Sequence, residues 1–121
     1  MRQTSLKRTN RGYVRNLGRA PGGGQPKFYL GHDRDEAIRR LGLITAMWAE
    51  VEERTKGYVG YEPTWTEEEL EAAKVLARGG PPTLPPKHLY SDGDFVEYVH
   101  DVARLSKATG VKFTPSPDTL A

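Results

Sequence analysis

The hydrophobic and polar positions of the chain change their spacing near residue 33. Before that point, apolar and polar side chains alternate at every second residue over Gly12–Gly18 and again over Lys27–Leu30, as they do in β-strands. Residues 19–26 between them are rich in glycine and proline, which predicts a turn or flexible loop. Because a two-stranded hairpin is marginally stable alone, we also expect a third strand over Ser5–Thr9 or a covering helix.

After residue 33, apolar side chains recur with the 3.6-residue period of a helix. The predicted stripe consists of Ala37, Leu41, Ile44, Trp48 and Val51. Asp33 and Glu36 have the spacing of a capping box at the start of this helix, and Gly57 is placed to end it. The pattern predicts a long amphipathic helix that packs on the sheet, giving a sheet-plus-helix unit over residues 1–57.

Two shorter helices are predicted in the rest of the chain. Thr66 and Glu69 have the spacing of a second capping box, and the helix that they open is expected to end at Gly79-Gly80. A third helix is expected over Asp94–Ala108, with Gly110 as its stop. The fold class that follows is α+β: a small two- or three-stranded antiparallel sheet packed on a long helix, followed by two shorter helices.

Proline and glycine mark the segments outside these elements. Residues 79–87, GGPPTLPPK, predict a polyproline-type spacer. Residues 58–110 would then form a helical extension that contains this spacer, and residues 111–121 are expected to be a disordered tail.

The alternation along each strand also assigns side chains to the two faces of the sheet. We expect Val14, Phe28 and Leu30 to face the helix. The opposite, outward face and the ends of the sheet would then carry the candidate nucleic-acid contacts: Tyr13, Arg15, Lys27, Tyr29, Arg11 and Arg19.

Charge is distributed unevenly along the chain. Residues 1–31 contain seven lysines and arginines and no acid, a net charge of +7, whereas the rest of the chain has 11 basic and 16 acidic side chains, a net charge of −5. Such a partition indicates a basic face or arm, for which nucleic acid is the usual partner. Cations replace counterions at phosphates, and a small sheet fits the major groove of B-DNA. We therefore expect binding to double-stranded DNA.

The residues that catalysis would need are scarce. The chain has no cysteine, which removes disulfides, thiolate chemistry and cysteine zinc sites. Its three histidines lie in separate segments without the spacing of metal ligands. The loop GRAPGGGQ from Gly18 lacks the lysine and the serine or threonine of a phosphate-binding loop. We predict no enzymatic activity, no cofactor and no metal site.

Targeting and membrane segments are not predicted either. The N-terminal region has no apolar run of signal-peptide length, and no segment has the apolar length of a transmembrane helix. Together with the lack of cysteine, this composition is typical of a cytoplasmic protein without a membrane partner.

One stretch of the chain resembles a known family. Phe28-Tyr29-Leu30-Gly31, followed by Asp33-x-x-Glu36-Ala37 and an amphipathic helix, resembles the N-terminal arm-type DNA-binding domain of phage-integrase-like tyrosine recombinases, over about residues 10–55. The resemblance implies a three-stranded sheet that is backed by a helix and enters the major groove. It implies DNA contacts by Tyr13, Arg15, Lys27 and Tyr29, and more loosely by Arg11 and Arg19. The large catalytic domain of a recombinase does not fit in this chain, so no recombinase activity is inferred.

Two other functions fit parts of the pattern. The acidic, helical region 66–110 would suit a protein-interaction adaptor, in which the basic segment adds only solubility. Basic and aromatic side chains on a sheet also suit single-stranded RNA, because bases stack on aromatic rings. Competition between duplex DNA and single-stranded RNA distinguishes the two polymers.

Overall fold

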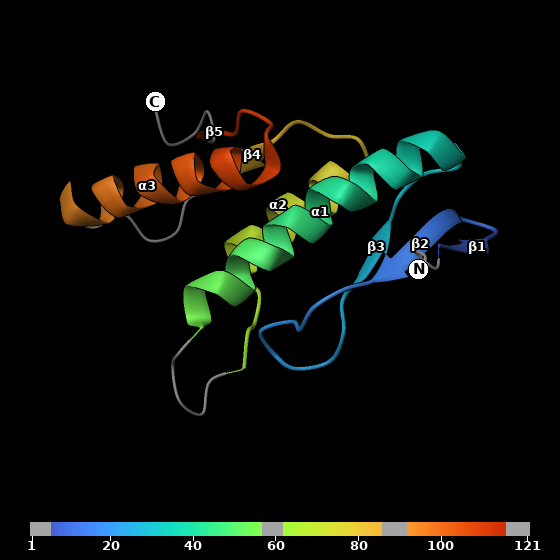
Figure 1. The fold of residues 1–121 in the computed structure, drawn as a ribbon, viewed down its shortest axis with the longest axis horizontal. Helices are drawn as coiled ribbons and strands as arrows, with labels where there is room; N and C mark the ends of the chain where they lie inside the picture. The colour runs from blue at the N-terminus through green and yellow to red at the C-terminus, as the bar shows by residue number, and fades with distance from the viewer. Residues whose placement is uncertain (1–5, 57–61, 86–91, 116–121) are drawn as a thin grey trace.

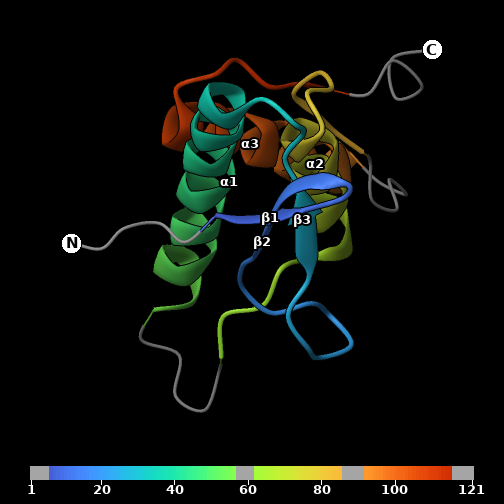
Figure 2. The same cartoon turned by 90° about the vertical axis from the view of Figure 1, so that its right-hand side faces the viewer.

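The computed structural model describes residues 6–56, 62–85 and 92–115. The fold is α+β, and a three-stranded antiparallel sheet lies at one end of a group of three helices (Figures 1 and 2). The elements in chain order are β1 (Lys7–Thr9), β2 (Gly12–Asn16), β3 (Lys27–Tyr29), α1 (Arg34–Thr55), α2 (Glu67–Ala77), β4 (Thr83–Leu84), α3 (Asp92–Thr109) and β5 (Thr114–Pro115). The predicted fold class is confirmed, and so is the third strand.

The first hairpin depends on a glycine. β1 and β2 pair through Thr9 and Gly12, so that Asn10 and Arg11 form the turn. Neither turn residue has a positive φ, whereas Gly12 has a φ of +100°. A left-handed residue after such a turn restores the strand direction, and glycine adopts that conformation without steric cost.

The register between β2 and β3 corrects the predicted faces of the sheet. Val14 lies opposite Tyr29, and Arg15 lies opposite Phe28. Directly opposite residues of an antiparallel pair share a face, so Arg15 is on the inner face with Phe28, and Val14 is on the outer face with Tyr29. Tyr13 also packs against the core. The predictions that Val14 faces the helix and that Tyr13 and Arg15 face outward are wrong.

The physical reason is that alternation acts only within one strand. It fixes which residues of β2 share a face. It does not fix whether those residues lie on the same side of the sheet as Phe28 or as Tyr29 of β3. Here the register is fixed by backbone hydrogen bonds, from Leu30 N–H to the Tyr13 carbonyl at 2.8 Å and from Leu17 N–H to the Pro26 carbonyl at 3.2 Å. A shift of one residue turns every side chain of a strand to the other face.

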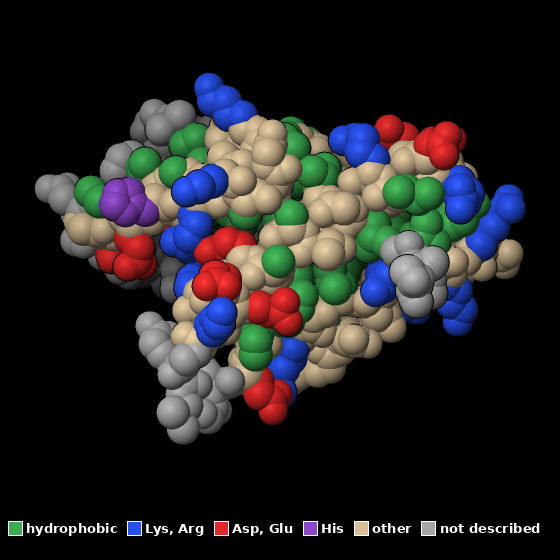
Figure 3. Space-filling model, in the orientation of Figure 1, with side chains coloured by type: hydrophobic (Ala, Val, Ile, Leu, Met, Phe, Trp, Pro, Cys, Tyr) green, Lys and Arg blue, Asp and Glu red, His purple; other side chains and the backbone are tan. Residues whose placement is uncertain are grey.

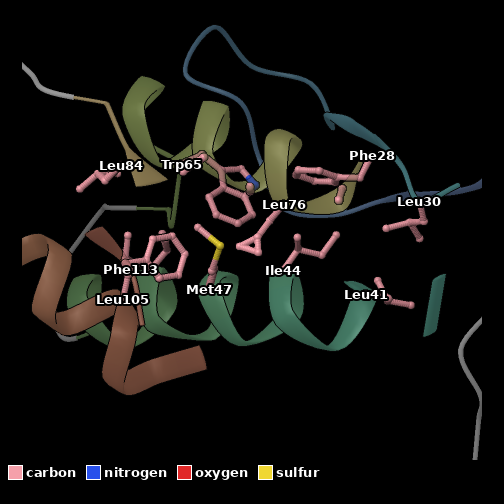
Figure 4. Close-up of a cluster of buried hydrophobic side chains, with 14 of the residues drawn as sticks. Phe28, Leu30, Leu41, Ile44, Met47, Trp65, Leu76, Leu84, Leu105 and Phe113 are labelled. Atoms are coloured by element: carbon pink, nitrogen blue, oxygen red, sulfur yellow. The ribbon is translucent and has the colours of Figure 1, made fainter. Parts of the chain in front are cut away.

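The long helix α1 forms the centre of the core. Asp33 caps it by accepting a hydrogen bond from Glu36 N–H at 2.9 Å. The predicted stop, Gly57, lies outside the described residues. Figure 4 shows buried side chains along α1, with Phe28 and Leu30 of the sheet region at one end and Leu105 and Phe113 at the other. Trp48, predicted as a core residue, is half-buried at the edge of this cluster.

The second helix begins and ends as its sequence predicts. Thr66 and Glu69 form the reciprocal capping box. After Ala77, Gly79 has a φ of +90° and its N–H donates to the Leu76 carbonyl, while Gly80 N–H donates to the Val75 carbonyl at 2.8 Å. This pair of bonds is a Schellman motif, which satisfies the last carbonyls of the helix.

The segments expected to be spacer and tail contribute to the core. Residues 83–84 pair in parallel with residues 114–115 to form the two-stranded sheet β4–β5, and Leu84 and Phe113 are each 3% exposed. One buried cluster contains side chains from residues 28–51 and from residues 65–113, so the core continues across the boundary expected at residue 57. The prediction of a disordered tail is wrong for residues 111–115, and residues 116–121 lie outside the described part.

An ion-pair cluster joins the three helices beside this core. Arg54 of α1 binds both carboxylate oxygens of Glu69 in α2, at 2.6 and 2.9 Å. Glu50 accepts from Arg54 at 3.1 Å and lies 2.6 Å from Arg104 of α3, which also contacts Asp101. The charges at this junction are therefore paired with one another.

Candidate nucleic-acid interface

The outer face of the sheet β1–β2–β3 is basic and partly aromatic. We call outer face the side that the register turns away from Phe28, and its side chains are Lys7, Thr9, Val14, Asn16, Lys27 and Tyr29, with Arg11 of the turn lying over it. Lys7, Arg11 and Lys27 are exposed, and Tyr29 is half-buried. Figure 3 shows lysine and arginine side chains around this end of the molecule, at the right of the view.

Arg11 and Tyr29 are in contact on the outer face. The guanidinium carbon of Arg11 lies 5.1 Å from the centre of the Tyr29 ring, within the range of a cation–π interaction. Nη1 of Arg11 is 3.5 Å from the Tyr29 hydroxyl oxygen, which is long for a hydrogen bond. The two side chains border a hollow of about 410 Å³, whose other lining residues are Thr9, Asn10, Val14 and Lys27.

The structure separates the six candidate residues of the sequence analysis. Arg11, Lys27 and Tyr29 come together on the outer face. Tyr13 and Arg15 lie on the inner face, where the Arg8 guanidinium carbon is 5.9 Å from the centre of the Tyr13 ring. Arg19 lies in the loop between β2 and β3, where it forms an ion pair with Glu62.

Sequence reasoning missed three polar residues of the outer face, Lys7, Thr9 and Asn16. Lys7 lies opposite Val14, and Asn16 lies opposite Lys27. The available signal was the alternation of Lys7 with Thr9 in the third strand, but its face becomes known only with the register of the sheet.

The cations of the outer face keep their charge available for a ligand. Within the described residues, no ion pair involves Lys7, Arg11 or Lys27. By contrast, Arg19 is already paired with the carboxylate of Glu62. Among the residues that the structure describes, the face therefore presents three positive charges that no acidic side chain neutralises by an ion pair.

A cleft of about 420 Å³ lies at the other end of the molecule, between α2, α3 and β4. Its two arginines, Arg54 and Arg104, are committed to the ion-pair cluster. Burial raises the pKa of the Glu50 carboxyl, and neighbouring Arg104 and Arg54 only partly oppose this. Burial also favours a higher pKa for Glu69, but hydrogen bonds and charge from Arg54 outweigh it and lower that pKa.

Metal binding finds no support in residues 6–56, 62–85 and 92–115. No group of three histidine or acidic side chains in these ranges is placed to hold a metal ion. None of the helices there combines the length and apolar character needed to cross a bilayer.

Comparison of the chain with protein-family models, with curated proteins and with solved structures gave no match. The resemblance to the arm-type domain therefore depends on the sequence pattern of residues 10–55.

Proposed function

We propose that this chain is a non-catalytic, double-stranded DNA-binding module and that the outer face of the sheet β1–β2–β3 is its contact surface. The observation that carries the proposal is the placement of Lys7, Arg11 and Lys27, which form no ion pair within the described residues, beside Tyr29 on one side of a small sheet. The resemblance to the arm-type domain of integrase-like recombinases supports the same function.

The dimensions of the sheet suit the major groove. Neighbouring strands lie about 4.8 Å apart, so three strands span about 10 Å between the outer backbones, against a groove about 12 Å wide. Lys7 belongs to the edge strand β1 and Lys27 to the edge strand β3. In the groove these two lysines would face the phosphates of opposite walls, while Arg11 and Tyr29 would face the base edges between them.

A titration of duplex DNA at several salt concentrations tests the proposal. Each phosphate contact contributes about −0.9 to the slope of log K against log salt, so the two lysines predict a slope of about −2. Lys27→Ala is expected to weaken binding to all duplexes and to reduce the slope by about 1, because it removes one phosphate contact. Fluorescence anisotropy of a labelled duplex measures both quantities.

Arg15→Ala is the matched control for that titration. It removes the same unit charge from the neighbouring strand, but from the inner face. We expect its affinity and salt slope to equal those of the unmodified protein. An equal loss for both variants would contradict the assignment of the outer face, and an absence of binding at low salt would contradict DNA binding. A single-stranded RNA competitor that displaces the labelled duplex at a lower concentration than unlabelled duplex DNA does would favour RNA as the ligand.

Protein docking by the helical region is a second candidate function. Val96 and Val99 of α3 are 53% and 40% exposed, one helical turn apart, which favours an apolar contact on this helix. Val99→Asp would then abolish capture of a partner in a pull-down and leave DNA affinity unchanged. Loss of DNA binding in that variant would count against two separate surfaces.

A further inference from the structure

The Arg11–Tyr29 pair bears on which DNA sequence the outer face would prefer, and the inference drawn from it rests on the proposed function. We propose that Arg11 is the specificity-determining residue of the interface and that Tyr29 is its positioning residue. Tyr29 holds the guanidinium over the outer face of the sheet, in position to bind the edge of a guanine in the major groove. Lys7 and Lys27 supply the contacts to phosphate that are independent of sequence.

The backbone that carries Arg11 is fixed by its own turn. Arg11 N–H donates to the Thr9 hydroxyl at 3.1 Å, and that hydroxyl donates to the Gly12 carbonyl at 3.0 Å. Gly12 in turn lies against Gly31, because a Cβ added to Gly12 would be 2.5 Å from the Gly31 carbonyl oxygen. The backbone at Arg11, from which its side chain extends, is therefore held in position against both β2 and the end of β3.

The ring that holds the other end of the side chain is fixed as well. Tyr29 lies between Phe28 and Leu30, both of which are 0% exposed, and it is opposite the buried Val14. With its neighbours packed in the core, Tyr29 has little freedom to turn away. The guanidinium above it thus loses less conformational entropy on binding than a free arginine would, which favours a defined contact.

The chemistry of the side chains divides their roles. Arginine presents a planar fork of donors, which matches O6 and N7 of guanine and is the commonest specific contact in the major groove. Lysine presents a compact charge on a flexible stem, which suits phosphate and carries no sequence information. Arg11, held by a ring, fits the first role, and Lys7 and Lys27 fit the second.

The same hairpin contains a matched control. Arg8 lies over Tyr13 at 5.9 Å, an arginine–tyrosine pair of similar geometry. Because Arg8 is opposite Tyr13 in the register, this pair belongs to the inner face. Arg8→Ala therefore removes an equal charge and an equal kind of contact from the face that we do not expect to meet DNA.

The test selects bound duplexes from a pool with randomised central base pairs, using the full chain, and sequences them. The unmodified protein is expected to enrich a G·C pair at one position. Arg11→Ala is expected to lose that preference by about tenfold, the discrimination of one good bidentate contact. Tyr29→Leu is expected to lose it to the same extent, whereas Tyr29→Phe keeps the ring and retains it. Arg8→Ala is expected to retain it too.

Two readouts separate positioning from damage to the fold. Thermal unfolding of each variant reports whether the sheet persists, and total binding at low salt is expected to persist in Tyr29→Leu through the two lysines. The double variant Arg11→Ala/Tyr29→Leu is expected to discriminate no worse than either single variant, because both act through one contact.

Three results would overturn the inference. A Tyr29→Leu variant that keeps the G·C preference would show that Tyr29 does not position Arg11. An unmodified protein that binds duplexes without any preference would remove the specificity role and leave DNA binding intact. An unmodified protein that binds no duplex would overturn the proposed function together with the inference.

Discussion

Gly12 links the position of a functional side chain to the conformation of a single residue. Its φ of +100° falls in the region that L-residues other than glycine rarely adopt, and the Gly31 carbonyl occupies the space where a Cβ would be. The residue before it is Arg11. A change at Gly12 therefore affects both the stability of the hairpin and the place of the arginine over Tyr29.

We expect Gly12→Ala to destabilise the fold by about 1–3 kcal/mol, the usual cost of a residue held in an unfavourable backbone region. The change is also expected to weaken duplex binding, because the turn that carries Arg11 would have to move. Gly42→Ala is the control, since Gly42 is an exposed position in α1 with open space around its Cβ. There alanine is expected to stabilise by about 0.5–1 kcal/mol. Urea unfolding measures both, and equal effects would contradict the strain at Gly12.

Single residues of the site were predictable only where local chemistry decides their place. Asp33 was found as the helix cap because capping needs a side chain and a nearby N–H. Lys27 and Tyr29 were found because they alternate with the apolar Phe28 and Leu30 within one strand, and Arg11 was found because it lies at the end of the sheet. Tyr13 and Arg15 were assigned to the wrong face because register is a property of two strands, and no local signal in either strand carries it.

At the scale of elements, the sequence predicts the helices well and the short strands poorly. α2 begins at its capping box and ends at Gly79, where the sequence places both signals. The strands β4 and β5 contain two residues each, which is too short for any periodicity. Proline and glycine around β4 predict a spacer, yet Leu84 is buried in the common core, where β4 contacts α2 and β5.

The C-terminal segment provides a test of this correction. Phe113 is 3% exposed within the core cluster, so Phe113→Ala is expected to destabilise the fold by about 3–5 kcal/mol through lost burial and the cavity left behind. Thr114→Ala, at the next and exposed position, is expected to change stability by less than about 0.5 kcal/mol. Urea unfolding compares the two. A neutral Phe113→Ala would mean that residues 111–115 are a tail after all.

At the scale of the whole molecule, the core and the ion-pair cluster make the sheet and the three helices one cooperative structure. The same helix α1 contacts strand β2 of the sheet and both later helices, and its side chains Leu41, Ile44, Met47 and Val51 are all buried in the common cluster. Arg54 adds an ion pair to the contact between α1 and α2 by binding Glu69, which is 4% exposed. Charge pattern alone could not predict the cluster, because its members lie in helices that are distant in sequence.

Glu69 and Glu50 give this cluster opposite responses to pH. The pKa of Glu69 is lowered in the fold, because Arg54 outweighs burial. The unfolded chain therefore binds the proton first as pH falls, and Glu69 contributes stability that is present above its ordinary pKa of 4.5 and lost below it. The pKa of Glu50 is raised by burial. Its folded form binds the proton first, so this residue costs stability as pH rises above 4.5.

Unfolding in urea between pH 3.5 and pH 7 measures the two contributions. Glu69→Gln is expected to be less stable than the unmodified protein at pH 7, and the difference is expected to shrink as pH falls below 4.5, where the unmodified carboxylate takes up its proton. Glu50→Gln is expected to show the reverse trend, with its relative stability increasing from pH 4.5 towards pH 7, because it removes a carboxylate that burial disfavours. Curves that stay parallel across this range would contradict both pKa shifts, and with them the pairing of buried Glu69 with Arg54 and the burial of the Glu50 carboxylate.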